Sequence, residues 1–309
     1  MTNLIFSLTF FIAIVVFTSC EDASPDPEPA QTYRVNGQMT VDGRARTYLL
    51  NLPPRYYADS SKFSLVIALH GAGGKASQFE QDYGFTNKAN DAGFIVVYPE
   101  GVQSNGVLGL RTWNAGTCCD YALENHIDDV NFIRALIDSL VIRYRVEPRK
   151  IYATGMSNGG MMAYRLACEM PEKIAAIAAV SATMVVAQPC DPSLPVPILH
   201  MHAALDAKVP YQGGIGLRGY YFPPVDSVLA VWSAKDACSE TAPVVVQNNQ
   251  YKFTSWSACG DDAVIECYLT ADGGHAWPGS SKAGRRGDTP STAINANDLI
   301  WEFFQRFER

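Results

Sequence analysis

Ile151-Tyr-Ala-Thr-Gly155-Met-Ser157-Asn-Gly-Gly160 joins an apolar run to a helical segment through a serine between glycines, and this junction is the strongest indication of the fold class. The run Ile151–Thr154 is typical of a buried strand, and Asn158–Glu169 has the composition of a helix. The pattern Gly-x-Ser-x-Gly between a strand and a helix indicates a sharp turn that presents the Ser157 hydroxyl. Without that setting the pattern would carry little weight.

Other apolar, β-branched runs repeat the strand pattern on both sides of this turn: Phe63–Leu69, Phe94–Tyr98, Ala175–Val180 and Pro197–His202. Continuous apolar runs are typical of strands buried on both faces of a parallel sheet. Helical spacing lies between them, for example over residues 130–140, where Asp128 or Asp129 is the expected cap. This alternation predicts an α/β fold, with a doubly wound, mostly parallel sheet and helices on both faces.

Strands are also predicted near the two ends of this region. The run Thr47–Leu52 follows an Asp42-Gly43 hairpin turn, and Ala263–Leu269 alternates apolar and polar residues. A last helix is expected within Ala293–Phe307.

Two downstream residues complete a serine-based mechanism. A serine hydroxyl needs a histidine to accept its proton and a carboxylate to orient that histidine. Asp206 follows the predicted strand at 197–202, and His275 follows the predicted strand at 263–269. Both are expected at the carboxyl edge of the sheet, where open α/β sheets place their sites. Ser157, Asp206 and His275 are therefore the predicted catalytic triad.

The glycine-rich segment His70-Gly-Ala-Gly-Gly74 follows the strand predicted at 63–69. Amides of such a loop, together with the amide after the nucleophile, stabilise the oxyanion formed in acyl transfer. Asn158 supplies the first of these amides. We favour Ala72 over Gly73 for the second, although the residue types do not decide between them.

These motifs together resemble the secreted polyhydroxybutyrate depolymerase and feruloyl esterase group, which includes acetylxylan esterases of carbohydrate esterase family one. The matching stretches are Leu69-His-Gly71, Trp113-Asn-Ala-Gly116 with Cys118-Cys119, Asp128-Asp-Val130, Ala153–Gly160, Asp206 with Val209-Pro-Tyr211, and Gly273–Gly279. The resemblance implies an α/β-hydrolase fold and carboxyl-ester hydrolysis by the triad, without a metal or cofactor. It also favours a disulfide between Cys238 and Cys259. One departure is His202-Ala-Ala-Leu-Asp206, where the group has His-Gly-Thr-Ala-Asp.

The N-terminal residues differ from the rest of the chain. Residues 1–19 contain an apolar run of signal-peptide length that ends directly before Cys20, which resembles the lipidation signal of bacterial lipoproteins. Residues 20–32 are acidic and proline-rich and are expected to form a tether. Residues 33–309 are then the catalytic domain. We expect an extracytoplasmic lipoprotein held at the membrane by its lipid anchor.

Charge and cysteine content limit the alternatives. The net charge is -7, and the tether alone contributes four of the negative charges, so no basic surface for nucleic acid is expected. Eight cysteines fit an oxidising compartment. A Cys168–Cys190 bridge and a vicinal Cys118–Cys119 bridge are open possibilities, as are other connectivities.

Two aromatic residues near the motifs, Trp113 and Trp277, are candidates for substrate binding, with core packing as an equal alternative. His200 and His202 alternate on one predicted strand. A structural role is favoured for them, because no third metal ligand is evident.

The predicted function is hydrolysis of feruloyl or acetyl esters on plant polysaccharide. Depolymerisation of polyhydroxyalkanoate or another short polyester is the first alternative, and acyl transfer is a further one. A noncatalytic, polymer-binding surface lipoprotein is the alternative of another class, and the intact triad argues against it.

Overall fold

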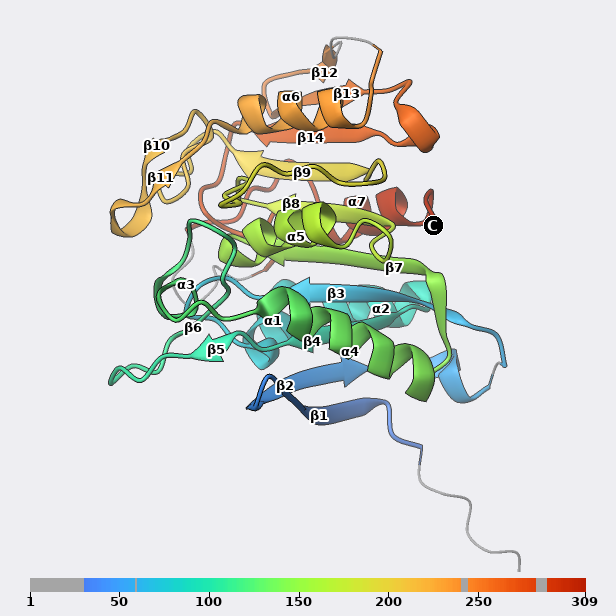
Figure 1. The fold of residues 1–309 in the computed structure, drawn as a ribbon. Helices are drawn as coiled ribbons and strands as arrows, with labels where there is room; N and C mark the ends of the chain where they lie inside the picture. The colour runs from blue at the N-terminus through green and yellow to red at the C-terminus, as the bar shows by residue number, and fades with distance from the viewer. Residues whose placement is uncertain (1–30, 59, 240–243, 282–287) are drawn as a thin grey trace, which may run out of the picture. The chain divides into compact units, whose positions relative to one another are not determined.

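A ten-stranded sheet organises the computed structural model, which describes residues 31–58, 60–239, 244–281 and 288–309 (Figure 1). Its order is β1-β2-β4-β3-β7-β8-β9-β14-β13-β12. The strands are β1 (Arg34–Val41), β2 (Arg44–Asn51), β3 (Phe63–Leu69), β4 (Ile95–Pro99), β7 (Val146–Met156), β8 (Ala176–Val180), β9 (Ile198–Ala203), β12 (Val244–Gln247), β13 (Tyr251–Trp256) and β14 (Ile265–Thr270).

The strands from β4 to β14 in this order run parallel, and the strands outside them pair antiparallel. Helices cover the sheet: α1 (Ala76–Tyr83), α2 (Phe85–Ala92), α3 (Asp120–Glu124), α4 (Asp129–Arg143), α5 (Asn158–Glu169), α6 (Val225–Lys235) and α7 (Ala296–Phe304). Short β5 (Val102–Gln103), β6 (Arg111–Thr112), β10 (Gly214–Ile215) and β11 (Tyr221–Phe222) form two small hairpins, and 3-10 turns cover Pro54–Tyr57, Leu217–Gly219 and Gly260–Asp262.

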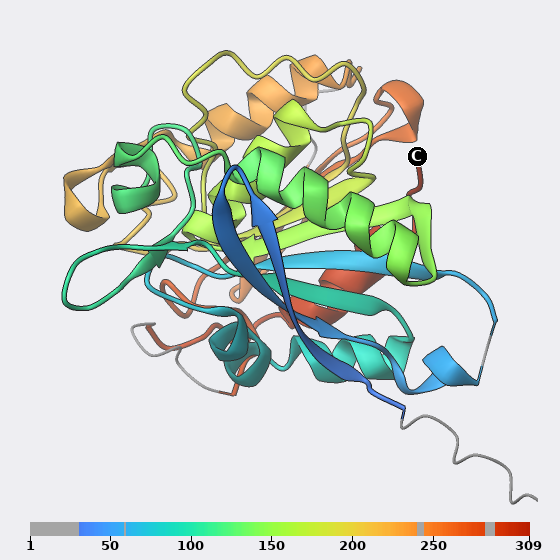
Figure 2. The ribbon, with the colours of Figure 1, turned by 60° about the horizontal axis from the view of Figure 1, so that its bottom comes forward.

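The sheet is buried on both faces, as the continuous apolar runs predicted. Along β3, Leu65 and Ile67 pack into one core with α4, α5 and α6, whereas Val66 packs into a second core with α1, α2 and α7. Figure 2 shows the two helix layers on either side of the sheet. The predicted doubly wound α/β architecture is confirmed.

Most predicted strands form within a residue or two of their expected bounds, and β7 is the main exception. It begins at Val146 rather than Ile151. Its first half contains Glu147 and Arg149, which are half-buried or exposed, so apolarity alone does not reveal it. The Asp42-Gly43 turn is confirmed, and both residues have positive φ (49° and 72°), as a tight hairpin turn requires.

Three disulfides join described cysteines. The predicted Cys238–Cys259 bridge is confirmed and ties the end of α6 to the loop after β13. Cys168–Cys190 and the vicinal Cys118–Cys119 bridge also form. Cys267, buried on β14, is the free cysteine of the described part.

Residues Thr32–Arg309 form one compact unit. The expected signal peptide (1–19), Cys20 and the tether up to residue 30 lie outside the described residues. Within the described ranges, no helix combines the length and apolarity that a membrane span requires.

Candidate active site

Ser157 lies in a strained turn between β7 and α5. Its φ is 55° and its ψ is -123°, a conformation that non-glycine residues rarely adopt. The flanking glycines are required by sterics. A Cβ on Gly159 would lie 2.1 Å from the Leu69 carbonyl oxygen, and one on Gly155 would lie 2.4 Å from the Gly159 carbonyl carbon. The turn therefore depends on close contact between α5, β7 and β3.

The sheet order brings the three predicted triad residues to one edge. Ser157 follows β7, Asp206 follows β9 and His275 follows β14, and these strands lie together in the parallel part of the sheet. His275 Nδ1 donates to Asp206 Oδ2 at 2.7 Å, which leaves Nε2 of a neutral ring as the acceptor. In the described structure no hydrogen bond joins Ser157 to His275, and contacts of this kind often tighten only when substrate binds.

Asp206 is held by further donors. Its Oδ1 accepts from the backbone amides of Lys208 and Val209, each at 2.9 Å. Burial raises the pKa of Asp206, but hydrogen bonds from His202 and His275 outweigh that effect and leave its pKa well below the usual value. The carboxylate is therefore ionised throughout the neutral range.

A buried chain of hydrogen bonds runs from Asp206 into the core. His202 Nε2 lies 2.8 Å from the Val209 carbonyl and 3.3 Å from Asp206 Oδ2, and because both are acceptors this nitrogen carries the proton. His202 Nδ1 lies 3.1 Å from His200 Nε2, and His200 Nδ1 lies 2.8 Å from the Tyr164 hydroxyl. Burial, together with His202, holds the pKa of His200 well below its usual value. The two histidines thus have the structural role expected of them.

Sequence reasoning missed Asp288. Its Oδ2 accepts from the backbone amide of His275 at 2.9 Å, and its Oδ1 accepts from Lys208 Nζ at 2.9 Å. Asp288 therefore connects the loop that carries His275 to the loop that carries Asp206. No local pattern marks it, because its partners are distant in sequence.

The loop that carries Asp206 has Ala203 where the related esterases have a glycine, and its turn still forms. Ala203, which replaces that glycine, is the last residue of β9 and does not have a positive φ. The Asp206 amide donates back to the Ala203 carbonyl at 3.1 Å and closes the turn. An alanine at this position therefore causes no backbone strain.

The loop after β3 lies beside Ser157. A Cβ on Gly71 would lie 3.4 Å from the Ser157 Cβ. The Gly73 amide already donates to the Arg111 carbonyl at 2.7 Å, so it is occupied. This contact favours Ala72 as the second oxyanion donor beside Asn158.

Both tryptophan candidates for substrate binding are core residues, so of the two alternatives the structure supports core packing. Trp113 and Trp277 have no exposed surface. The Trp277 ring stacks on Tyr83, and its indole N–H donates to Asn297 Oδ1 at 2.8 Å. Sequence proximity to His275 gave no information about the direction of the side chain.

The two aspartates before α4 have different roles. Asp128 caps the helix by accepting from the Asn131 amide at 2.9 Å. Asp129 is fully buried, pairs with Arg46 at 2.6 Å and accepts from the Asn114 amide at 2.8 Å. The pair connects α4, β2 and the loop after β6.

Known proteins resemble this chain in sequence and fold. Residues 46–194 match the family described as esterase PHB depolymerase. NocK of Nocardia uniformis subsp. tsuyamanensis, described as an esterase, is 29% identical over 292 residues, which cover 87% of this chain and 80% of that protein. Feruloyl esterase B of Piromyces equi is 33% identical over 174 residues, which cover 55% of this chain but only 31% of that protein.

The likeness extends to a solved structure. An acetyl xylan esterase from Aspergillus awamori superposes with a TM-score of 0.59 over 88% of this chain and 99% of that one, at 16% identity. At that identity the likeness concerns the fold. Sequence and fold agree: residues 46–194 match the esterase PHB depolymerase family, and the chain is a carboxyl-ester hydrolase with an α/β-hydrolase fold.

Proposed function

We propose that Ser157 is the nucleophile and His275 the general base of a two-step ester hydrolysis, and that the Asp206 carboxylate orients His275. Ser157 Oγ attacks the ester carbonyl, and His275 transfers its proton to the leaving alcohol. Water, activated by the same histidine, then releases the acid. The amides of Ala72 and Asn158 stabilise the oxyanion in both steps. The 2.7 Å bond between His275 and Asp206, at the sheet edge where Ser157 is strained, carries this proposal.

The substrates that we propose are feruloyl or acetyl esters on plant polysaccharide. Relatives named feruloyl esterase B and acetyl xylan esterase support them. A short polyester is the second candidate. It is supported by the family description and by two exposed apolar side chains, Leu205 beside Asp206 and Ile215 on β10.

We also propose that the protein is an extracytoplasmic lipoprotein anchored through Cys20. The disulfides of the described part suit an oxidising compartment. A Cys20→Ala variant should move the protein from the membrane fraction to the soluble fraction. An unchanged distribution would refute the anchor.

Hydrolysis of p-nitrophenyl acetate and methyl ferulate tests the mechanism. Ser157→Ala should reduce kcat by about 10⁴-fold or more. Ser181→Ala is the matched control, because this buried serine follows the neighbouring strand β8 and also has a positive φ, 48°. It should retain activity. If the folded wild type cleaves neither ester, or if Ser157→Ala stays active, the proposed mechanism is wrong.

A further inference from the structure

The two proposed oxyanion donors belong to different segments of the chain. Ala72 lies in the loop after β3, and Asn158 is the first residue of α5. A hole of this kind works only while both amides stay within about 3 Å of the developing oxyanion. The relative position of the two segments therefore matters as much as either amide.

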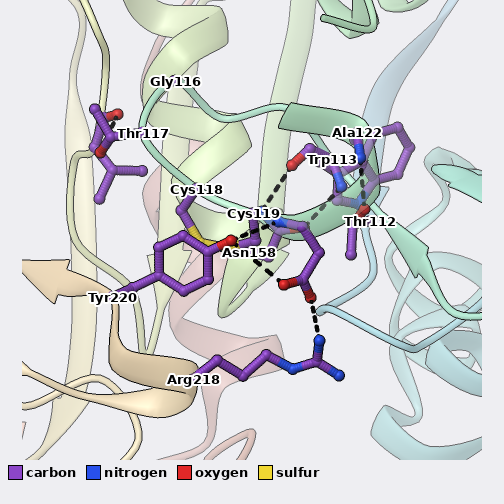
Figure 3. Close-up of a disulfide and its surroundings, with 12 residues drawn as sticks. Thr112, Trp113, Gly116, Thr117, Cys118, Cys119, Ala122, Asn158, Arg218 and Tyr220 are labelled. Carbon is purple, nitrogen blue, oxygen red and sulfur yellow. Dashed lines mark hydrogen bonds and ion pairs between the residues drawn. A yellow bond between two sulfur atoms is a disulfide. The ribbon is translucent and has the colours of Figure 1, made fainter. Parts of the chain in front are cut away.

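Trp113 is bound to the Asn158 side of the hole through its backbone. Its amide donates to Asn158 Oδ1 at 2.7 Å, and Asn158 Nδ2 donates to its carbonyl at 3.0 Å (Figure 3). Both residues are buried. The Asn158 side chain thus pairs with Trp113 much as a neighbouring strand would, and this pairing fixes the start of α5.

Trp113 is bound to the Ala72 side through its indole. The indole N–H donates to the His70 carbonyl at 2.9 Å, and the two rings lie 5.1 Å apart between centroids. Arg111, two residues earlier, accepts from the Gly73 amide at 2.7 Å. Ala72 is therefore held between two residues that are both bonded to the 111–113 segment.

The Trp113 backbone is itself well fixed. Its carbonyl also accepts from the Cys119 amide at 3.2 Å, within the loop that contains the vicinal disulfide (Figure 3). The next residue, Asn114, donates its amide to the buried Asp129 and accepts from Arg165 Nη1 at 2.6 Å. The segment can therefore act as a rigid reference for both donors.

We propose that Trp113 is a positioning residue that sets the separation of the two oxyanion donors. It has no exposed surface, so it acts through His70 and Asn158 rather than on the substrate. The inference rests on the proposed function, because it assumes that Ser157 forms an oxyanion beside Ala72 and Asn158.

Trp113→Phe tests the proposal. The variant keeps the backbone bonds to Asn158 and an aromatic ring but removes the donor to His70. We expect kcat for p-nitrophenyl acetate to fall about 10-fold to 100-fold, somewhat less than when a donor is deleted outright. KM should stay within about twofold, because the Michaelis complex makes less use of the oxyanion donors. The affinity for a boronic acid, which forms a tetrahedral adduct with the serine, should fall by the same factor as kcat.

Trp232→Phe is the matched control. Trp232 is also fully buried, but its indole N–H has no hydrogen-bond partner among the described residues. The Trp232→Phe variant loses the same ring volume as Trp113→Phe but no hydrogen bond, so its kcat should stay within about twofold of the wild-type value. Asn158→Leu keeps the backbone amide and removes the other half of the bridge. It should reproduce the loss of kcat, and it serves as the test if Trp113→Phe fails to fold.

The outcomes separate this proposal from the mechanism on which it rests. The positioning role alone would be overturned if folded Trp113→Phe keeps the wild-type kcat and boronic acid affinity. If Trp113→Phe does not fold, the same result in Asn158→Leu would overturn it. A raised KM with unchanged kcat would also overturn it, because that result indicates direct substrate binding. Activity that survives in Ser157→Ala, assayed in parallel, would overturn both proposals.

Discussion

Gly159→Ala should destabilise the protein by about 2 kcal/mol. The added Cβ would lie 2.1 Å from the Leu69 carbonyl oxygen and 2.6 Å from that of His70, whereas ordinary contact begins near 3.4 Å. The start of α5 and the end of β3 would have to separate by about 1.3 Å. Overpacking of a core costs about 1–3 kcal/mol, and a clash with two backbone carbonyls belongs at the upper end. The better helix propensity of alanine returns at most about 1 kcal/mol.

Thermal unfolding measures this effect against Gly106→Ala. A Cβ on Gly106 would lie 3.8 Å from its nearest neighbour, Ser104 Oγ, so the Tm of that variant should stay close to that of the wild type. For a domain of this size, 2 kcal/mol corresponds to a fall in Tm of about 3–4 °C. Equal Tm values for the two variants would refute the steric reasoning, because the gap between α5 and β3 would then accommodate a methyl group.

Two further predictions concern buried charges. Asp129→Ala leaves the Arg46 guanidinium buried without its carboxylate partner and should lower the free energy of unfolding, measured in urea, by about 3–5 kcal/mol. Glu172→Ala removes the exposed partner of Arg134 and should lower it by less than about 1 kcal/mol. Similar losses in the two variants would contradict a stabilising role for the buried Arg46–Asp129 pair. Burial raises the pKa of Asp236 to about 7, whereas the same side chain ionises near pH 4 in the unfolded chain. Between these two values the native state binds more protons than the unfolded state, so the stability of the native state falls as the pH rises. Asp236→Asn should lack this contribution, and its Tm should increase relative to the wild type from pH 4 to pH 7; a constant difference across that range would show that Asp236 does not titrate there.

Features encoded in short, continuous segments were predictable from the sequence. The strands of the parallel core are apolar on both faces, so their runs stand out without knowledge of their neighbours. The turn at Ser157 is marked by its own glycines, and the positions of Asp206 and His275 after strands follow from the chain order. The hairpin turn at Asp42-Gly43 predicted an extended run before it, but not the bounds of β1, because most of its residues alternate between exposed and half-buried at the edge of the sheet.

Features that depend on contacts between distant segments were not predictable. For Trp113 the sequence left substrate binding and core packing open, and its indole bonds to His70, 43 residues earlier. Asp288 holds the His275 amide from a loop with no recognisable motif, and Asp129 is paired with Arg46, 83 residues away. Each of these contacts is determined by how the loops converge at the sheet edge, which residue types and spacing do not encode.

The hydrogen-bonded chain behind Asp206 has a consequence for how this protein can vary. The Tyr164 hydroxyl has His200 as its hydrogen-bond partner in the described structure, so it donates there, and every proton along the chain then points toward Asp206. Replacing any one member by an apolar residue would leave a buried donor or acceptor unmatched in its neighbour. Substitutions at Tyr164, His200 and His202 should therefore be strongly non-additive. A joint change at the three positions should therefore cost less than the sum of the single changes, and its remaining cost is the loss of the His202 donor to Asp206 and the Val209 carbonyl.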